Sequence, residues 1–121
     1  MRIVVTGGTG FVGSHVVNAY VAAGKQVIPV DNMSEAKREH VNPDARLVEM
    51  DCLDPALVDL FRELQPDAVN HHAANASVSV SVQRPIFDLR QNIQGTLSVL
   101  EAARLAKAGK FIYASSGGAM Y

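Results

Sequence analysis

The sequence has little of the chemistry that crosslinks or anchors a protein. It contains one cysteine, Cys52, and no tryptophan. One thiol cannot form an internal disulfide, and no His/Cys cluster has metal-ligand spacing, so we expect no bound metal and a reducing, cytoplasmic compartment. The 11 basic and 12 acidic residues nearly balance, with a formal net charge of -1. This balance excludes the electrostatic footprint of a nucleic-acid or membrane-surface protein.

Long apolar runs are also absent. The run at residues 3–5 ends at Thr6 and two glycines, which makes it too short for a targeting segment or a membrane span. The chain has no internal repeat and no Pro/Gly/Ser-rich linker. Its 121 residues, 48% hydrophobic and 19% charged, are typical of one globular domain, residues 1–121, that buries a core without crosslinks.

Short β-branched runs alternate along the chain with helical patterns. Apolar runs predict strands buried on both faces at residues 1–5, 26–30, 46–50, 67–71 and 110–114. Helices are predicted at residues 11–23, 55–65 and 85–108. Because strands and helices alternate, the crossovers should be right-handed and the sheet parallel. The predicted fold class is α/β, a Rossmann-type three-layer sandwich whose five parallel strands have the order 3-2-1-4-5.

Three further patterns concern packing. In the first helix, Val12, Val16, Ala19 and Ala23 share one face, which should be buried. In the last helix, the stripe expected to pack on the sheet is Ile86, Leu89, Ile93, Leu97, Leu100 and Ala103. At residues 77–82 serine and valine alternate with a period of two, which taken alone favours a half-buried strand.

Glycines follow the first strand. Residues 6–13 contain G-x-G-x-x-G at Gly8, Gly10 and Gly13, and an overlapping G-x-x-G-x-x-G that starts at Gly7. Between a buried strand and a helix, bare backbone can approach a pyrophosphate, and the helix N-terminus offers unpaired N–H groups. The plainer interpretation is a tight turn whose glycines serve packing. The strand-turn-helix context favours a nucleotide site.

Asp31 closes the second predicted strand, eighteen residues after Gly13. This is close to the spacing of about 20 residues expected for the acid that binds both adenosine ribose hydroxyls. A carboxylate there would repel a 2′-phosphate, so the predicted cofactor is NAD rather than NADP. The competing interpretation is a strand-end aspartate that stabilises a turn.

Other polar groups lie at the ends of later elements. His71 and His72 are adjacent on an extended segment and should point to opposite sides, which argues against a shared metal. Asn92, inside the last helix, either faces solvent or braces a neighbouring loop by hydrogen bonds. Ser115 and Ser116 follow the fifth strand, at the edge where ligands of such folds bind, but serine is also an ordinary loop residue.

These motifs occur together in one known family. The sequence resembles the extended short-chain dehydrogenase/reductases, and among them the NAD-dependent epimerase/dehydratases of the UDP-glucose 4-epimerase type. The resemblance is carried by residues 6–13, 31–32, 51–52, 71–74, 92–96 and 111–121, in family order and spacing. Together these motifs are highly specific, although no single one is.

The resemblance implies a role for each matching residue in a site for NAD. The pyrophosphate would be held by Gly7, Gly10, Phe11, Val12 and Gly13, and the adenosine ribose by Asp31 and Asn32. Asp51 and Cys52 would hold the adenine, and Ala73, Ala74 and Asn75 would line the nicotinamide side. Asn92 would hold the loop beneath the nicotinamide. The catalytic hydroxyl maps to Ser116, or one residue earlier to Ser115, and would share the proton of the sugar hydroxyl being oxidised. The family also implies a loop with a short helical turn at residues 77–82, in place of a strand.

The activity implied is that of a nucleotide-sugar 4-epimerase, in which sugar C4 gives hydride to NAD and receives it back on the other face. A dehydratase of the family would have Asp-Glu after the hydroxyl residue, where this sequence has Gly117 and Gly118. The sequence also leaves open a non-catalytic dinucleotide-binding or sensor module, and a scaffold that binds nothing.

The family's Tyr-x-x-x-Lys pair, which supplies the catalytic base, is absent from this sequence. We therefore expect a fragment of a longer enzyme, truncated before strands six and seven and inactive by itself, whose full-length form acts on a nucleotide sugar. The fifth strand would have an open edge and the long helix would lack neighbours. We accordingly expect a homo-oligomer formed through the strand-5 edge or the long helix.

Overall fold

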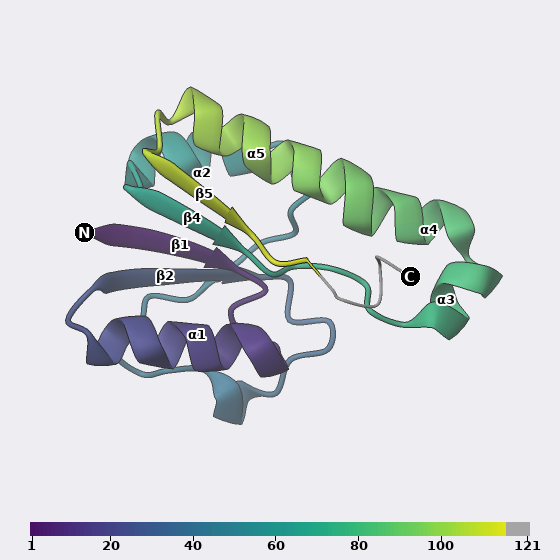
Figure 1. Ribbon diagram of the computed structural model, residues 1–121, viewed down its shortest axis with the longest axis horizontal. Coiled ribbons are helices and arrows are strands. Elements are labelled where there is room, and N and C mark those ends of the chain that lie inside the picture. The colour runs from purple at the N-terminus through teal and green to yellow at the C-terminus, as the bar shows by residue number, and fades with distance from the viewer. Residues whose placement is uncertain (116–121) are drawn as a thin grey trace.

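The computed structural model describes residues 1–115, as five strands and the helices that connect them (Figure 1). The strands are β1 (Arg2–Thr6), β2 (Gln26–Asp31), β3 (Val48–Glu49), β4 (Ala68–His71) and β5 (Lys110–Tyr113). The helices are α1 (Phe11–Ala22), α2 (Leu57–Leu64), α3 (Val78–Gln83), α4 (Pro85–Leu89) and α5 (Gly95–Leu105). A 3-10 turn, η1 (Arg38–His40), follows β2, and a π-helical segment, η2 (Arg90–Gln94), joins α4 to α5.

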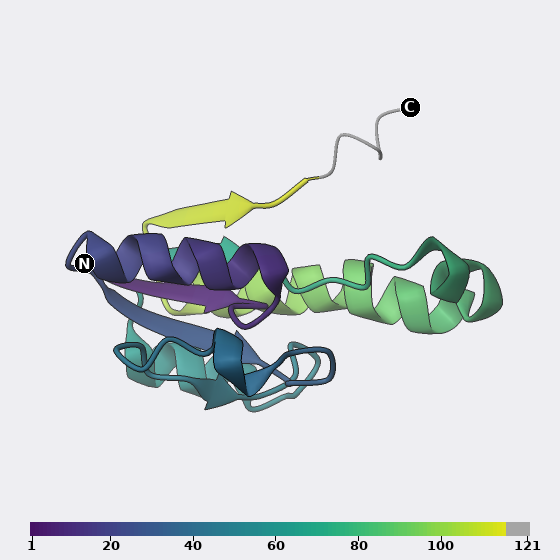
Figure 2. The same cartoon turned by 90° about the horizontal axis from the view of Figure 1, so that it is seen from below.

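The sheet confirms the predicted topology. All neighbouring strands are parallel, and the order is β3-β2-β1-β4-β5. Figure 1 shows α1 on one side of the sheet and α2 and α5 on the other, which is the three-layer arrangement. In Figure 1 and Figure 2 alike, α3 and α4 extend beyond the carboxyl ends of the strands. From β1 the chain adds β2 and β3 on one side of the sheet, and then β4 and β5 on the other side of β1. Parallel α/β sheets place their ligand crevice at such a switch point, here between β1 and β4.

Two hydrophobic cores form because β1 is buried on both faces. Val4 packs with Phe61 of α2 and Val99 of α5 in one core, while Ile3 and Val5 pack with Val17 of α1 in the other. Successive side chains of a strand point to opposite faces, so the uninterrupted apolar run of β1 serves both layers.

The face by which α1 packs differs from the predicted one. Val12, Ala19 and Ala23 are exposed and Val16 is half-buried, whereas Gly13, Ser14 and Val17 are buried. Gly13 is enclosed by the preceding turn, since a Cβ on it would overlap the carbonyl oxygen of Gly7. This close backbone approach sets how α1 is rotated, and it overrides the spacing of the valines and alanines.

The long helix also packs by another face than predicted. Leu97 is 59% exposed, and the residues that share its face are exposed as well: Ile86, Leu89, Ile93 and Leu100. The buried face consists of Gly95, Val99, Ala102 and Ala103, so that only Ala103 of the predicted stripe is buried. Small side chains let α5 approach both the sheet and α2 closely, and this packing leaves the larger apolar residues outside.

The remaining local predictions are mostly correct. Residues 77–82 are largely α3, a helix whose N-cap Ser77 accepts a bond from the N–H of Val80 at 3.2 Å, so the alternating pattern was misleading and the family-based expectation is confirmed. The third strand is shorter than predicted, because only Val48–Glu49 pairs with β2. In residues 1–115, no helix is both long and apolar enough to cross a bilayer.

Candidate functional site

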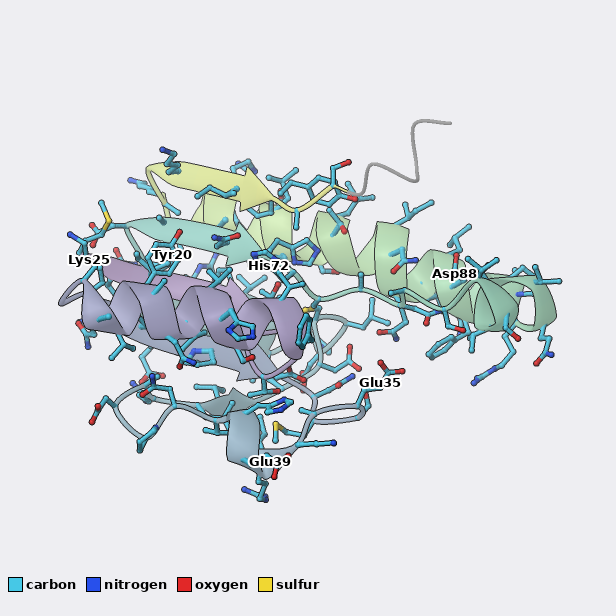
Figure 3. All side chains as sticks on the ribbon, turned by 60° about the horizontal axis from the view of Figure 1, so that its bottom comes forward. Tyr20, Lys25, Glu35, Glu39, His72 and Asp88 are labelled. Atoms are coloured by element: carbon cyan, nitrogen blue, oxygen red, sulfur yellow. The ribbon has the colours of Figure 1, made fainter. Side chains whose placement is uncertain are left out.

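A cavity of about 160 Å³ opens at the carboxyl ends of β1, β2 and β4. Its walls come from the loops that follow these strands and β3, and from one face of α4 and η2. The residues that line it are Gly7, Gly10, Val30, Asp31, Asn32, Ser34, Glu35, Ala36, Met50, Asp51, Cys52, His72, Ala73, Ala74, Asn75, Phe87 and Gln91. Figure 3 labels Glu35 on the loop after β2 and His72 directly after β4, which both line the cavity, and also Asp88 on α4.

The glycine turn forms one wall of the cavity. Gly7 has φ +65°, a conformation that L side chains rarely adopt, and its N–H donates to the carbonyl oxygen of Val30 at 2.8 Å. A Cβ on Gly7 would lie 2.8 Å from the amide nitrogen of Ala73, so the loop after β4 can pass over the turn only because Gly7 is glycine. The sequence pattern thus marks two backbone approaches, at Gly7 and at Gly13.

Helix α1 begins directly beside this wall. Its N-cap is Gly10, and no side chain caps it among residues 1–115. The N–H groups of its first turn, at Phe11, Val12 and Gly13, have no partner within the helix, and the positive end of the helix dipole lies at this terminus. None of these three predicted pyrophosphate residues lines the cavity, and the side chains of Phe11 and Val12 are exposed.

Asp31 connects β2 to the glycine turn. Its Oδ2 accepts a bond from the N–H of Thr9 at 3.1 Å, and its Oδ1 accepts one from the N–H of Met33 at 2.9 Å. The interpretation of Asp31 as a residue that stabilises a turn is therefore confirmed. The same carboxylate lines the cavity, and each oxygen keeps a second lone pair for a ligand hydroxyl.

Asn32, Asp51 and Cys52 complete the wall beside Asp31. The side-chain amide of Asn32 donates to Oδ2 of Asp51 at 3.2 Å, and Oδ1 of Asp51 accepts from the N–H of Leu53 at 2.8 Å. Burial, followed by the charges of Asp51 and Asp31, raises the pKa of the Cys52 thiol to about 12. Cys52 is therefore a neutral, apolar part of the wall at neutral pH and not a nucleophile.

The opposite wall is the loop after β4, which contributes Ala73, Ala74 and Asn75. Asn92 does not line the cavity but binds both backbone groups of Asn75: its Oδ1 accepts from the N–H at 2.7 Å, and its Nδ2 donates to the carbonyl oxygen at 3.0 Å. The side chains of Asn75 and Asn92 each donate to Oδ1 of Asp88 at 3.0 Å. Of the two roles considered for Asn92, the structure thus has the loop-bracing one.

The two histidines at the end of β4 point to opposite sides. His71 is buried in the layer of α5, where it contacts Thr6 and Thr96, while His72 lines the cavity. The Nε2 of His72 is buried and has no hydrogen-bond partner within the described part of the chain. In residues 1–115 no group of three or more His, Cys, Asp or Glu side chains is arranged to hold a metal ion.

Sequence reasoning missed several lining residues, namely Val30, Ser34, Glu35, Ala36, Met50, His72, Phe87 and Gln91. Phe87 and Gln91 are four residues apart on one helical face, a spacing that could have associated them with each other but not with the cavity. Ser115 is exposed after β5 and does not line the cavity. Ser116, the predicted catalytic residue, lies outside the described residues.

Known proteins resemble this chain over nearly all of it. The UDP-glucose 4-epimerase of Mycolicibacterium smegmatis is 40% identical, in an alignment that covers 100% of this chain and 40% of that protein. The solved structure of the Thermotoga maritima UDP-glucose 4-epimerase with UDP-glucose is 43% identical with a TM-score of 0.95, covering 98% of this chain and 39% of that one. The Thermus thermophilus UDP-glucose 4-epimerase in complex with NAD is 42% identical with a TM-score of 0.92, covering 97% and 38%.

The parallel sheet, the glycine turn and the crevice at the switch point define a Rossmann-type α/β domain. The family model of the NAD dependent epimerase/dehydratases matches residues 3–121. The chain belongs to this family, as the sequence motifs predicted. It spans about two fifths of the length of the relatives named above.

Proposed function

We propose that this chain is the NAD-binding, N-terminal part of a nucleotide-sugar 4-epimerase of the UDP-glucose/galactose type. The observation that carries the proposal is the cavity itself, because it gathers four separate motifs around one space: Gly7 and Gly10, Asp31 and Asn32, Asp51 and Cys52, and Ala73 to Asn75. These are the segments that the family resemblance assigns to successive parts of one dinucleotide.

The described residues fit the chemistry of such a cofactor. The uncapped start of α1 and the bare backbone of Gly7 and Gly10 suit a pyrophosphate. The Asp31 carboxylate suits a ribose diol and disfavours a 2′-phosphate. The neutral Cys52 thiol suits the flat, largely apolar face of an adenine. Bound NAD would supply a reversible hydride acceptor for C4 of the sugar.

In this reaction the chain's own part is to bind and orient. The loop of Ala73, Ala74 and Asn75, held by Asn92, would position the nicotinamide side. Ser116 would hydrogen-bond the sugar hydroxyl, with Ser115 as the neighbouring candidate for this role. The sequence has no Tyr-x-x-x-Lys pair, so we propose that this chain by itself does not catalyse epimerisation.

A dehydratase of the same family is the second candidate function. Gly117 and Gly118 stand where a dehydratase would have its acid and base, which favours the epimerase. A non-catalytic dinucleotide-binding module would keep the cavity and lose only the chemistry. Epimerase assays of a longer chain that continues into a Tyr-x-x-x-Lys motif would separate the epimerase from such a module, since a binding module would have no activity.

We also propose that the chain forms a homo-oligomer. We propose a cytoplasmic location because a single cysteine cannot form an internal disulfide, so the fold needs no oxidising compartment. The support is the outer face of the long helix, on which Ile93, Leu97 and Leu100 are exposed, and the outer edge of β5, which pairs only with β4 within residues 1–115. Light scattering of the chain should give a mass above that of a monomer, and Leu97→Glu should reduce it if the helix is the contact. A monomer at high concentration would contradict the proposal.

Calorimetric titration with NAD and NADP tests the proposed function. We expect one NAD per chain and weaker binding of NADP, because the 2′-phosphate would meet the charge of Asp31. Equal affinity for both would remove the role proposed for Asp31. If neither bound, the cavity would be a feature of a scaffold only.

A further inference from the structure

His71 is the one strongly buried titratable side chain near the cavity that the proposed function leaves unused within residues 1–115. It is 2% exposed and lies behind the wall formed by the loop after β4. Its imidazole contacts two hydroxyls, with Nδ1 2.6 Å from Oγ1 of Thr6 and Nε2 3.0 Å from Oγ1 of Thr96. These three residues belong to three different elements, β1, β4 and α5, so the ring connects segments that are far apart in the sequence.

The direction of each hydrogen bond follows from the donors available. The hydroxyl of Thr96 donates its single proton to the carbonyl oxygen of Asn92 at 2.6 Å. Oγ1 of Thr96 must then accept from His71, which puts the ring proton on Nε2. Nδ1 of His71 therefore carries a lone pair, and the hydroxyl of Thr6 donates to it.

The other contacts of Thr6 agree with this direction. Having donated its proton to the ring, Oγ1 of Thr6 faces two backbone donors, the N–H of His72 at 3.2 Å and the N–H of Ala73 at 3.3 Å. Both of these amides belong to the start of the loop that lines the cavity. The chain of hydrogen bonds thus runs in one direction, from the loop amides through Thr6, His71 and Thr96 to Asn92.

Asn92 closes the chain of bonds into a ring. Its backbone carbonyl oxygen accepts the hydrogen bond from the Thr96 hydroxyl, and its side chain binds both backbone groups of Asn75. The loop after β4 is therefore fixed at both ends, by Thr6 at Ala73 and by Asn92 at Asn75. The carbonyl of Asn92 lies in the π-helical segment η2, and the bond from Thr96 joins η2 to the first turn of α5.

The surroundings of His71 keep the imidazole neutral. The rings of Phe111 and Tyr113 lie on it at centroid distances of 6.1 Å each. Burial, and secondarily the adjacent His72, lowers the pKa of His71 to about 4. A protonated imidazole would present its second N–H to the hydroxyl oxygen of Thr6, which already has two backbone donors. The closed set of hydrogen bonds therefore requires the neutral imidazole.

We propose that His71 is a positioning residue for the cavity: in its Nε2–H form it transmits a fixed order of hydrogen bonds from Thr6 to Thr96 and so holds the loop of residues 73–75 in its binding conformation. This proposal rests on the proposed function in so far as the ligand is NAD. The arrangement of the loop itself is a property of the unliganded chain and can be measured without any ligand.

The test uses two matched substitutions of Thr96 in this chain. Thr96→Val keeps the shape but removes the hydroxyl that accepts from His71 and donates to Asn92, while Thr96→Ser keeps the hydroxyl. We expect Thr96→Val to weaken NAD binding about tenfold in calorimetry, since it leaves the buried Nε2–H of His71 without an acceptor and removes the hydroxyl bond to Asn92. Thr96→Ser should bind within about twofold of the unsubstituted chain. Unchanged NAD affinity in a folded Thr96→Val variant would overturn the proposal.

Two further measurements need no NAD: one on the unsubstituted chain, and one that compares it with the two Thr96 variants. Heteronuclear NMR of the imidazole nitrogens should find His71 neutral at neutral pH with its proton on Nε2. Hydrogen exchange should find the amides of Ala73 and Asn75 protected, and their protection should fall in Thr96→Val but not in Thr96→Ser. A proton on Nδ1, or exchange at Ala73 and Asn75 that is equal in both variants, would overturn the proposal. If the unsubstituted chain binds no NAD, the proposed function fails, and these ligand-free measurements still decide the role of His71.

Discussion

The two walls of the cavity are built on different physical principles. The wall of the glycine turn is defined by the absence of side chains: Gly7 and Gly13 allow backbone segments to lie closer together than any Cβ permits. The wall after β4 is defined by side-chain hydrogen bonds, with Thr6, His71 and Asn92 fixing the loop at two points. The first wall should therefore fail when atoms are added, and the second when a donor or an acceptor is removed.

The largest effect is expected from adding one methyl group to the first wall. In Gly13→Ala the new Cβ would overlap the Gly7 carbonyl oxygen, which is backbone and cannot rotate away. We expect a loss of at least about 3 kcal/mol in the free energy of unfolding, measured by urea denaturation. Gly10→Ala is the control, because its Cβ would lie 3.4 Å from the same oxygen. Equal losses in the two variants would show that steric closeness does not define this wall.

The next effect concerns the second wall and appears as a pH dependence. The pKa of His71 is about 4 in the folded chain, below its ordinary value of 6.5. Between these two values the unfolded chain binds a proton that the folded chain does not, so stability should fall as the pH decreases from 6.5 to 4 and level off about one pH unit below 4. The expected loss is about 2 to 3 kcal/mol.

His71→Gln tests this assignment. Its unfolding free energy should lose less between pH 6.5 and pH 4 than that of the unsubstituted chain. The pKa of His72 is also lowered by burial, so His72 adds a dependence of the same sign that remains in the variant. His15→Gln, at an exposed position of α1, should keep the full loss. Identical pH curves for all three proteins would show that His71 is not the source.

A smaller effect is expected from reversing one donor in the second wall. Asn92→Asp replaces an amide that donates to Asn75 and Asp88 by a carboxylate that can only accept. We expect an unfolding free energy lower by about 1 to 2 kcal/mol at neutral pH and faster hydrogen exchange at Asn75. Asn42→Asp, at an exposed amide that donates to Asn18, is the control and should change stability by less than about 0.5 kcal/mol.

The smallest effect concerns the ligand and not the fold. Asp31→Asn removes a charge from the first wall while keeping an oxygen that can accept from Met33. We expect the ratio of NAD to NADP affinity to fall about tenfold in paired titrations, because the 2′-phosphate is no longer repelled. Glu35→Gln removes another carboxylate from the cavity wall and should change the ratio by less than about twofold. If both variants shift the ratio equally, the discrimination comes from the general field of the cavity.

Much of the first wall could be predicted from the sequence. Glycine spacing after a buried strand reports directly on backbone conformation, and Asp31 follows at the length of one helix and one strand. Asn32, Asp51, Cys52 and the loop of residues 73–75 were placed through family resemblance, and the structure brings all of them to the same cavity. What they bind stays a prediction.

The second wall shows where sequence patterns stop being informative. His71 looked like half of an adjacent histidine pair, but its partner Thr6 is 65 residues away in the chain and Thr96 is 25 residues away. No local spacing encodes these contacts. The apolar stripe of the long helix misled for a related reason, since periodicity marks an apolar face without stating whether the sheet or something else covers it.

The sequence by itself determined the parallel sheet, the order of its strands, the glycine turn and the acid at the end of β2. The glycine turn and the acid depend on a few consecutive residues, the parallel sheet follows from the alternation of strands and helices, and the strand order follows from the fold type that these motifs indicate. Only the tertiary structure decided that α5 turns its small residues inward and that His71 joins Thr6 to Thr96. Those outcomes depend on which surfaces can approach most closely and on which donors remain for each acceptor, and both are settled only when distant segments meet.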